Sequence, residues 1–270
     1  MSNLQQRIIS AVILAAIVLV VTWFGGWSFR LLCAVLGGAM YYEWSAMSAR
    51  PETQTNHLVG AVGLGVALVA MFFGASAGGA IALLLVAAVV TFAHAASGKH
   101  DLWAASGVVY AGLSAIAIAY LRSDVWAGFL AIIYLFAVVW ATDIFAYFVG
   151  RAVGGPKLAP SISPGKTRSG AIGGAVAALI AALVFGWAAG VEHLAWLAIV
   201  AVILSVISQA GDLFESWVKR RHGAKDSGWI IPGHGGVMDR VDGLVAAGVA
   251  LYIIGAGENG LNAAALGLFG

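Results

Sequence analysis

Residues 225–242 bring together many side chains that can handle phosphate and metal ions. The segment reads Lys-Asp-Ser-Gly-Trp-Ile-Ile-Pro-Gly-His-Gly-Gly-Val-Met-Asp-Arg-Val-Asp. The carboxylates of Asp239 and Asp242 suit hard cations, and Mg²⁺ usually takes one or two carboxylates together with phosphate oxygens. The groups suited to meet phosphate are Lys225, His234, Gly235, Gly236 and Arg240. The segment therefore indicates phosphate chemistry, and the alternative is a polar re-entrant loop without chemistry.

The helix expected just before this segment carries a second set of reactive residue types. Asp212, Ser216 and Lys219 are spaced at i, i+4 and i+7, so a carboxylate, a hydroxyl and an ammonium share one helical face. A cation and a phosphate could both bind along that face, with Arg220 beside them. The alternative is a helix end whose Lys219, Arg220 and Arg221 compensate the helix dipole and set the membrane topology.

Asp143 extends the candidate site toward the middle of the chain. It lies in an apolar run, where an ionised side chain is costly unless it faces a watered cavity or a bound cation. Asp212 also lies in an apolar run, and we expect it to be one of the main metal ligands. Asp143, Asp226 and Asp242 form a second rank, as ligands of metal or water or as partners for nearby Lys and Arg.

The basic loop 151–169 offers further phosphate-binding groups. Gly165, Lys166 and Thr167 resemble the end of a P-loop, but the glycine needed five positions earlier is Pro160, so a Walker site is rejected. Lys166 and Thr167 remain candidates for phosphate recognition. The alternative is that this loop only fixes topology or meets anionic lipid headgroups.

The composition limits the kind of protein that positions these groups. Of the 270 residues, 61% are hydrophobic and 10% are charged, and the mean hydropathy is +0.96. Soluble domains carry roughly 25% charged residues, so a water-soluble fold is excluded. A net charge of +2 is too small to indicate nucleic-acid binding. The single cysteine, Cys33, excludes an intrachain disulfide, and no Cys/His cluster has zinc spacing.

We therefore expect an all-α polytopic membrane protein with about nine transmembrane helices. A helix needs about 20 apolar residues to cross the roughly 30 Å hydrocarbon layer, because its backbone polar groups must be paired within the segment. Apolar runs of this kind lie at 8–24, 28–48, 57–73, 75–95, 103–121, 125–150, 170–190, 192–215 and 243–257.

The distribution of basic residues predicts the orientation. With nine spans, the N-terminus and the loops 49–57, 96–102, 151–169 and 216–242 fall on one face. Every Lys and Arg except Arg30 and Arg122 lies on that face. The positive-inside rule then places the N-terminus and the polar active-site loops in the cytoplasm, and the C-terminus outside.

Residues that could take part in catalysis or ligand binding are unevenly spread along the sequence. We therefore expect the chain to have two parts. Residues 1–124 should form about five N-terminal transmembrane helices. Residues 125–270 should form a catalytic transmembrane region with cytoplasmic loops 151–169 and 216–242. The Gly-rich stretch 170–175 is expected to pack closely against a neighbouring helix.

The run from Ser216 to Asp242 resembles the signature of phosphatidate cytidylyltransferases, also called CDP-diacylglycerol synthases. It reads Ser-Trp-Val-Lys-Arg, four residues, then Lys-Asp-Ser-Gly-Trp-Ile-Ile-Pro-Gly-His-Gly-Gly-Val-Met-Asp-Arg-Val-Asp. The resemblance extends more loosely through residues 163–167 and 143–147, so its motifs cover about 143–243. The family pattern usually has Lys in place of Gly165 and commonly Glu in place of Ser169.

The resemblance implies a membrane enzyme of phospholipid biosynthesis that joins CTP to phosphatidic acid and releases pyrophosphate. Family members use Mg²⁺, with a second cation at a two-metal centre. The family's metal-binding acids fall on Asp212 and Asp239, and Ser216 and Lys219 match active-site positions. The resemblance also favours a cell (inner) membrane protein among membrane lipids, and is compatible with a homodimer.

On this interpretation, the catalytic residues are Asp212, Asp239, Lys219, Lys225 and Arg240. The substrate-binding residues are Ser216, Lys166, Thr167, Arg220, His234, Gly235 and Gly236. Two alternatives stay open. A CTP-dependent lipid kinase acting on a polyprenol-type alcohol would release CDP instead of pyrophosphate, and a secondary transporter would show ion-linked flux without chemistry.

Overall fold

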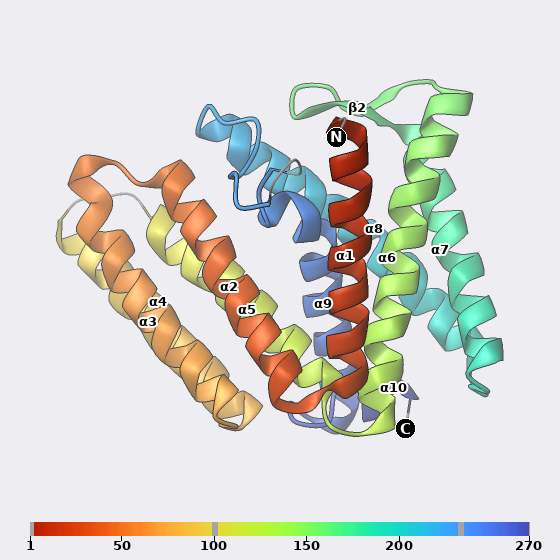
Figure 1. Cartoon of the computed structure of the whole chain (residues 1–270), viewed down its shortest axis with the longest axis horizontal. Helices are drawn as coiled ribbons and strands as arrows, with labels where there is room; N and C mark the ends of the chain where they lie inside the picture. The colour runs from red at the N-terminus through yellow and green to blue at the C-terminus, as the bar shows by residue number, and fades with distance from the viewer. Residues whose placement is uncertain (1–2, 99–101, 232–234, 270) are drawn as a thin grey trace.

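The computed structural model describes residues 3–98, 102–231 and 235–269, and the side chains from residue 12 onward within those ranges. Within them the chain forms nine long helices, two short helices and one small hairpin (Figure 1). In chain order the elements are α1 Asn3–Phe24, α2 Gly26–Ser48, η1 Pro51–Thr53, α3 Gln54–Phe72, α4 Ala77–Ser97, α5 Trp103–Arg122, α6 Trp126–Val153, β1 Lys157–Ala159, β2 Ser163–Thr167, α7 Arg168–Ala188, α8 Leu194–Arg221, α9 Met238–Asn259 and α10 Leu266–Phe269.

The helices match the apolar runs expected from the sequence. Each of the nine runs overlaps one long helix, with ends that differ by a few residues. Seven of the described helical segments, from Pro51–Phe72 to Met238–Asn259, are long and apolar enough to cross a membrane. In α1 the described apolar part is the shorter Val12–Phe24. The prediction of a helical polytopic membrane protein is confirmed, while nine crossings stay a prediction.

The fold is all-α as expected except for a small hairpin in the loop 151–169, which the sequence did not predict. Here β1 and β2 form an antiparallel hairpin in which Lys157 lies opposite Thr167. Gly154 and Gly155 have positive φ angles of 65° and 100°, which end α6 in a conformation that glycine adopts readily. Prolines at 156, 160 and 164 cannot continue a helix, so the chain stays extended.

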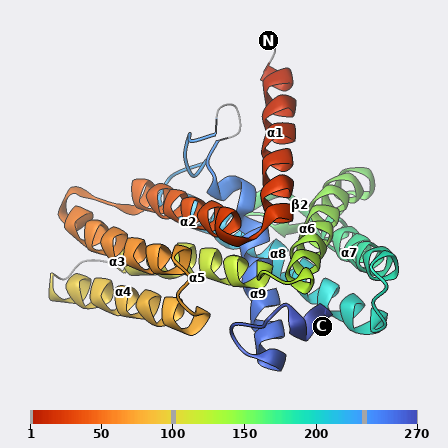
Figure 2. The same cartoon turned by 60° about the horizontal axis from the view of Figure 1, so that its bottom comes forward.

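The helices form two groups on either side of α9. Helices α2 to α5 lie together on one side and α6 and α7 on the other, while α8 starts beside α7 and its C-terminal part reaches α2 and α5, where Phe214 packs against Trp44 and Trp217 against Trp103 (Figures 1 and 2). Helix α9 packs against α5, α6 and α8. The start of α1, the hairpin and the segment that follows α8 lie at one end of the bundle, and α10 lies at the opposite end. The polar loops therefore gather at a common end.

The outer helix faces are apolar, as lipid contact requires. Val62, Val89 and Trp187 are among the large hydrophobic side chains that remain exposed in the isolated chain. Inside, α6 and α7 approach closely because α7 presents glycines to α6. A Cβ on Gly170 would lie 2.5 Å from the Ala146 carbonyl oxygen, and one on Gly174 would lie 2.8 Å from that of Thr142. The predicted packing role of 170–175 is confirmed.

We expect Gly174→Leu to lower the thermal stability of the protein in detergent, because the new side chain would press against the α6 backbone. Overpacking of this kind typically costs about 1–3 kcal/mol. Gly38→Leu is the matched control, since a Cβ at Gly38 on α2 meets nothing within 4 Å. Equal melting temperatures for the two variants would contradict the close α6–α7 contact.

Candidate active site

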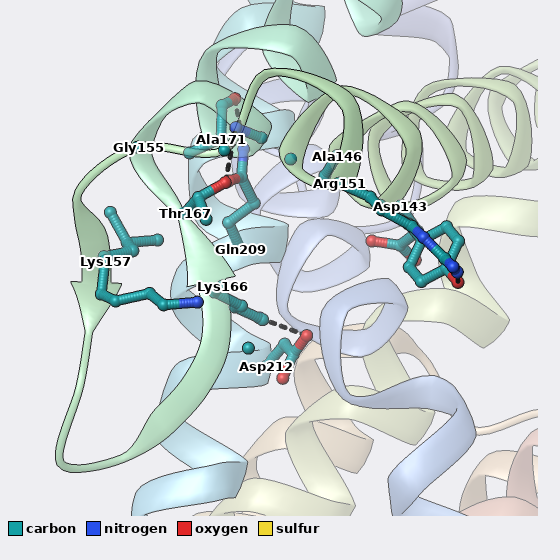
Figure 3. A pocket seen from close by; sticks show the side chains of 16 residues that line it. Asp143, Ala146, Arg151, Gly155, Lys157, Lys166, Thr167, Ala171, Gln209 and Asp212 are labelled. Carbon is teal, nitrogen blue, oxygen red and sulfur yellow. Dashed lines mark hydrogen bonds and ion pairs between the residues drawn. The ribbon is translucent and has the colours of Figure 1, made fainter.

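A cavity of about 620 Å³ opens between α6, the β1–β2 hairpin, α7 and α8 (Figure 3). Lys157 and Lys166 enter it from the hairpin, Asp143 and Arg151 from α6, and Asp212 from α8. The other polar lining side chains are Tyr147, Thr167 and Gln209. A cavity with three cationic and two acidic side chains suits a polyanionic ligand together with bound cations.

Lys166 and Asp212 form an ion pair that joins the hairpin to α8 across this cavity (Figure 3). Both side chains keep about a third of their surface exposed, 28% and 35%, so a ligand can reach them. The Ser216 hydroxyl donates to Oδ1 of Asp212 at 3.4 Å, as their i, i+4 spacing predicts. The structure thus brings together three of the residues named from the sequence.

Two further acids lie close enough to Asp212 for their charges to interact with it. Asp143 comes from α6 and Asp242 from α9, and both also interact with Lys166. Oδ1 of Asp242 accepts a hydrogen bond from the Gly243 amide at 2.8 Å. One carboxylate, that of Asp212, is therefore paired with the Lys166 ammonium, and two more from α6 and α9 are near enough to feel its charge.

A second charged cluster is centred on Lys219, about two turns beyond Asp212 along α8. Its ammonium lies 2.6 Å from Oε2 of Glu215 and 2.6 Å from Oδ1 of Asp239, so it joins α8 to α9. Glu215 is only 1% exposed. Sequence analysis gave Glu215 no role, although an acid four residues before Lys219 on the same helix was the available signal.

Asp239 closes the loop that precedes α9. Its Oδ2 accepts hydrogen bonds from the Ser227 amide and hydroxyl, both at 2.9 Å, and from the Gly236 amide at 3.0 Å. Gly235, with φ of +81°, pairs with Ile231 in an isolated antiparallel bridge. The glycines at 235 and 236 therefore allow this loop to fold tightly around one carboxylate.

The two clusters are electrostatically continuous. The charge of Glu215 interacts with Asp239 in the second cluster and with Asp242, which in turn interacts with Asp212. The acids of α6, α8 and α9 therefore interact electrostatically from one cluster to the next, with Lys166 and Lys219 among them.

Other predicted residues lie at the edge of this arrangement or outside it. Arg220, Lys225, Asp226 and Arg240 are exposed and do not line the cavity. Arg220 donates to the Ala224 carbonyl at 3.1 Å. His234 lies outside the described residues.

Several residues lining the cavity were not singled out from the sequence. Thr167 was a candidate from the sequence, and its hydroxyl accepts a hydrogen bond from the Gly170 amide at 3.1 Å, which caps α7. Gln209 donates to the Ala171 carbonyl at 3.3 Å from α8. From the sequence, Arg151 counts only toward the orientation, and Lys157 toward the orientation or contact with anionic lipid headgroups. A local pattern could not show that the hairpin brings Lys157 to this cavity, or that Arg151, which donates to the Tyr147 hydroxyl at 2.9 Å on α6, lines it too.

The acids around the cavity can contribute ligands to a metal ion but do not form a complete metal site by themselves. Within the described residues, no group of three or more His, Cys, Asp or Glu side chains is already arranged to hold a metal ion. The donor chemistry nevertheless fits Mg²⁺, because Asp143, Asp212 and Asp242 leave surplus negative charge around Lys166. Phosphate oxygens would have to complete the coordination.

The chain belongs to the cytidylyltransferase family, whose model matches residues 5–256. It is 49% identical over 257 residues to the phosphatidate cytidylyltransferase of Brucella abortus, covering 95% of this chain and 94% of that protein. It is 31% identical over 264 residues to the phosphatidate cytidylyltransferase of Bacillus subtilis, covering 94% and 98%. The similarity thus includes the N-terminal half, which the motifs alone did not reach.

We expect Lys219→Met to destabilise the folded protein strongly, because Glu215 and Asp239 would then share a buried site without their cation. Removing one partner of a buried ion pair typically costs about 3–5 kcal/mol. The measurement is the melting temperature in detergent, with the exposed Arg221→Met on the same helix as control. Adding Glu215→Gln should restore part of the loss, and a Lys219→Met variant as stable as Arg221→Met would refute this account.

Proposed function

We propose that this chain catalyses the phosphatidate cytidylyltransferase reaction. It transfers the cytidylyl group of CTP to phosphatidic acid and releases CDP-diacylglycerol and pyrophosphate, a step of phospholipid biosynthesis. The observation that carries the proposal is family membership over residues 5–256, which includes both charged clusters. The cavity supports it, because cationic and acidic side chains meet there beside apolar helices.

The reaction needs neutralisation of the substrates' negative charge more than it needs a strong base. The phosphate of phosphatidic acid is already anionic near neutral pH, so one of its oxygens can attack the α-phosphorus of CTP directly. The bond from the α-phosphorus to the bridging oxygen breaks, and pyrophosphate leaves with the electron pair. Bringing two polyanions together is the main barrier, so fixed positive charge in the cavity lowers it.

Lys157, Lys166 and Arg151 are placed to bind phosphate oxygens inside the cavity. The Thr167 hydroxyl and the Gln209 amide add polar contacts beside them. Lys219 is held between two acids, so we assign it to fixing Asp239 and to balancing charge at the edge of the site. Exposed Lys225, Arg220 and Arg240 would neutralise the triphosphate or lipid phosphate from the loop side, with His234 and the 235–236 backbone beside them.

We assign Asp212 and Asp239 to Mg²⁺ and a second cation, with Asp143, Asp226 and Asp242 as further ligands. When bound, such cations neutralise phosphate charge and polarise the reacting phosphate. Asp212 is supported by its place in the cavity beside two other acids. Three of the hydrogen bonds that Asp239 accepts go to Oδ2, and the Lys219 ammonium takes one of the two lone pairs of Oδ1, so the other lone pair can contact a cation.

The active site faces the cytoplasm of the cell membrane in this proposal, with nine crossings and the N-terminus inside. The strong bias of Lys and Arg toward the N-terminus and the loops predicted to be cytoplasmic supports this orientation. The gathering of the hairpin, the start of α1 and the segment after α8 at one end agrees with it. Membrane lipids would cover the apolar helix faces, and we expect a homodimer, which the mass of the detergent-solubilised particle would test.

The proposed reaction is tested in detergent micelles that contain phosphatidic acid, Mg²⁺ and CTP labelled at the α-phosphate. We expect label in the lipid product together with released pyrophosphate. A lipid kinase would instead release CDP and leave the α-label in it, and a transporter would give neither product. Absence of labelled lipid from well-folded protein across several phosphatidic acids and metals would overturn the proposal.

Asp212→Asn should lower turnover by at least about 100-fold, because a charged ligand of the proposed cation that neutralises the reacting phosphates is lost. Asp239→Asn should have a comparable effect, and both proteins should still insert and purify. Arg50→Ala is the control, since Arg50 lies in the α2–α3 connection and is assigned only to topology. Near-normal turnover in either Asn variant would refute its metal assignment.

A further inference from the structure

Glu43 on α2 is a buried carboxylate in the half of the chain to which the sequence assigned no chemistry. Its side chain is 0% exposed, and both oxygens are turned toward the segment that leads into α9. Oε1 accepts the Val237 amide at 2.7 Å, and Oε2 accepts the Met238 amide at 2.8 Å. Glu43 thus binds residues nearly 200 positions later in the chain, with sequence separations of 194 and 195.

These contacts provide the N-terminal cap that α9 lacks locally. The first amides of a helix have no partner within the helix and are usually bound by a polar side chain just before it. Here that residue is Val237, whose apolar side chain cannot accept a hydrogen bond. A carboxylate from α2 takes its place, and its negative charge also suits the positive end of the helix dipole.

The same carboxylate reaches the other end of the loop. The Ser227 hydroxyl lies 3.0 Å from Oε2 of Glu43 and 2.9 Å from Oδ2 of Asp239, so it sits between the two acids. A Cβ on Gly228 would come within 2.8 Å of Glu43, and one on Gly236 within 2.7 Å. The loop backbone is therefore folded closely around the Glu43 carboxylate, and little space is left for another arrangement.

We propose that Glu43 is a positioning residue for the reaction: it holds residues 227–228 and 236–238, so that Asp239 and Lys219 keep their places. It acts through Ser227, the start of α9 and Asp239, and it does not line the cavity. The inference rests on the proposed function for its kinetic consequence. The contacts themselves depend only on the fold.

Glu43→Gln tests this with little change in size. An amide presents one donor group to a site where two backbone amides and a hydroxyl donate, so at least one hydrogen bond is lost. We expect kcat/KM for CTP to fall by about 100-fold, as small displacements of catalytic groups can cause. The KM for CTP should rise as well as kcat fall, whereas a smaller folded fraction would lower kcat alone.

Tyr41→Phe is the matched control on the same helix. Tyr41 is also buried, and its hydroxyl donates to the His57 carbonyl at 3.0 Å, away from the loop. This variant loses one buried hydrogen bond but should keep kcat and KM within about twofold, because no loop contact changes. Both variants are assayed well below their melting temperatures. Unchanged kcat and KM in Glu43→Gln, or equal losses in both variants, would overturn the proposal.

A second measurement separates this inference from the proposed function. Amide hydrogen exchange at residues 235–240 should be about tenfold faster in Glu43→Gln than in Tyr41→Phe. If the unsubstituted protein makes no labelled lipid, the proposed function fails, and exchange still decides whether Glu43 holds the loop. If Glu43→Gln does not fold, Ser227→Ala takes its place, and full activity with unchanged exchange in that variant would overturn the proposal.

Discussion

The placement of Lys219 between Glu215 and Asp239 is the interaction on which the rest of the site depends. A buried charge is tolerated only when it is paired, and removing a single partner leaves the other charges in a costly environment. Since Glu215 belongs to α8 and Asp239 to α9, the ammonium at 2.6 Å from each fixes the relative position of the two helices. The distance and direction of Asp242 from Asp212 follow from that arrangement.

The loop before α9 is held by the N-terminal half as well as by the catalytic part. The expected division at residue 124 described the distribution of charged motifs, and Glu43 crosses it by binding Val237 and Met238. The first helices are therefore more than an anchor in the membrane. The family model also spans these helices, since it matches residues 5–256.

The sequence predicted those features that depend on local periodicity. Helix positions followed from apolar runs of membrane-spanning length, and the Asp212–Ser216 contact followed from i, i+4 spacing. The hairpin at 157–167 was missed, since a short basic loop has no alternating apolar pattern to indicate strands. Glu43 was missed for a different reason. Nothing near it in the chain indicates that its partners lie 184 to 195 residues away.

The two charged clusters are best understood as one site, because neither is balanced alone. Around the cavity, Asp143, Asp212 and Asp242 interact with a single ammonium, that of Lys166. Beside them, Lys219 is shared by two acids, and Glu215 interacts with Asp242. The acids that interact with Lys166 outnumber it, while Lys157 and Arg151 also line the cavity, so a cation held by these acids would add to the fixed positive charge that meets a triphosphate. The proposed binding of a nucleotide together with divalent cations accounts in physical terms for acids placed where the proposed substrates are anionic.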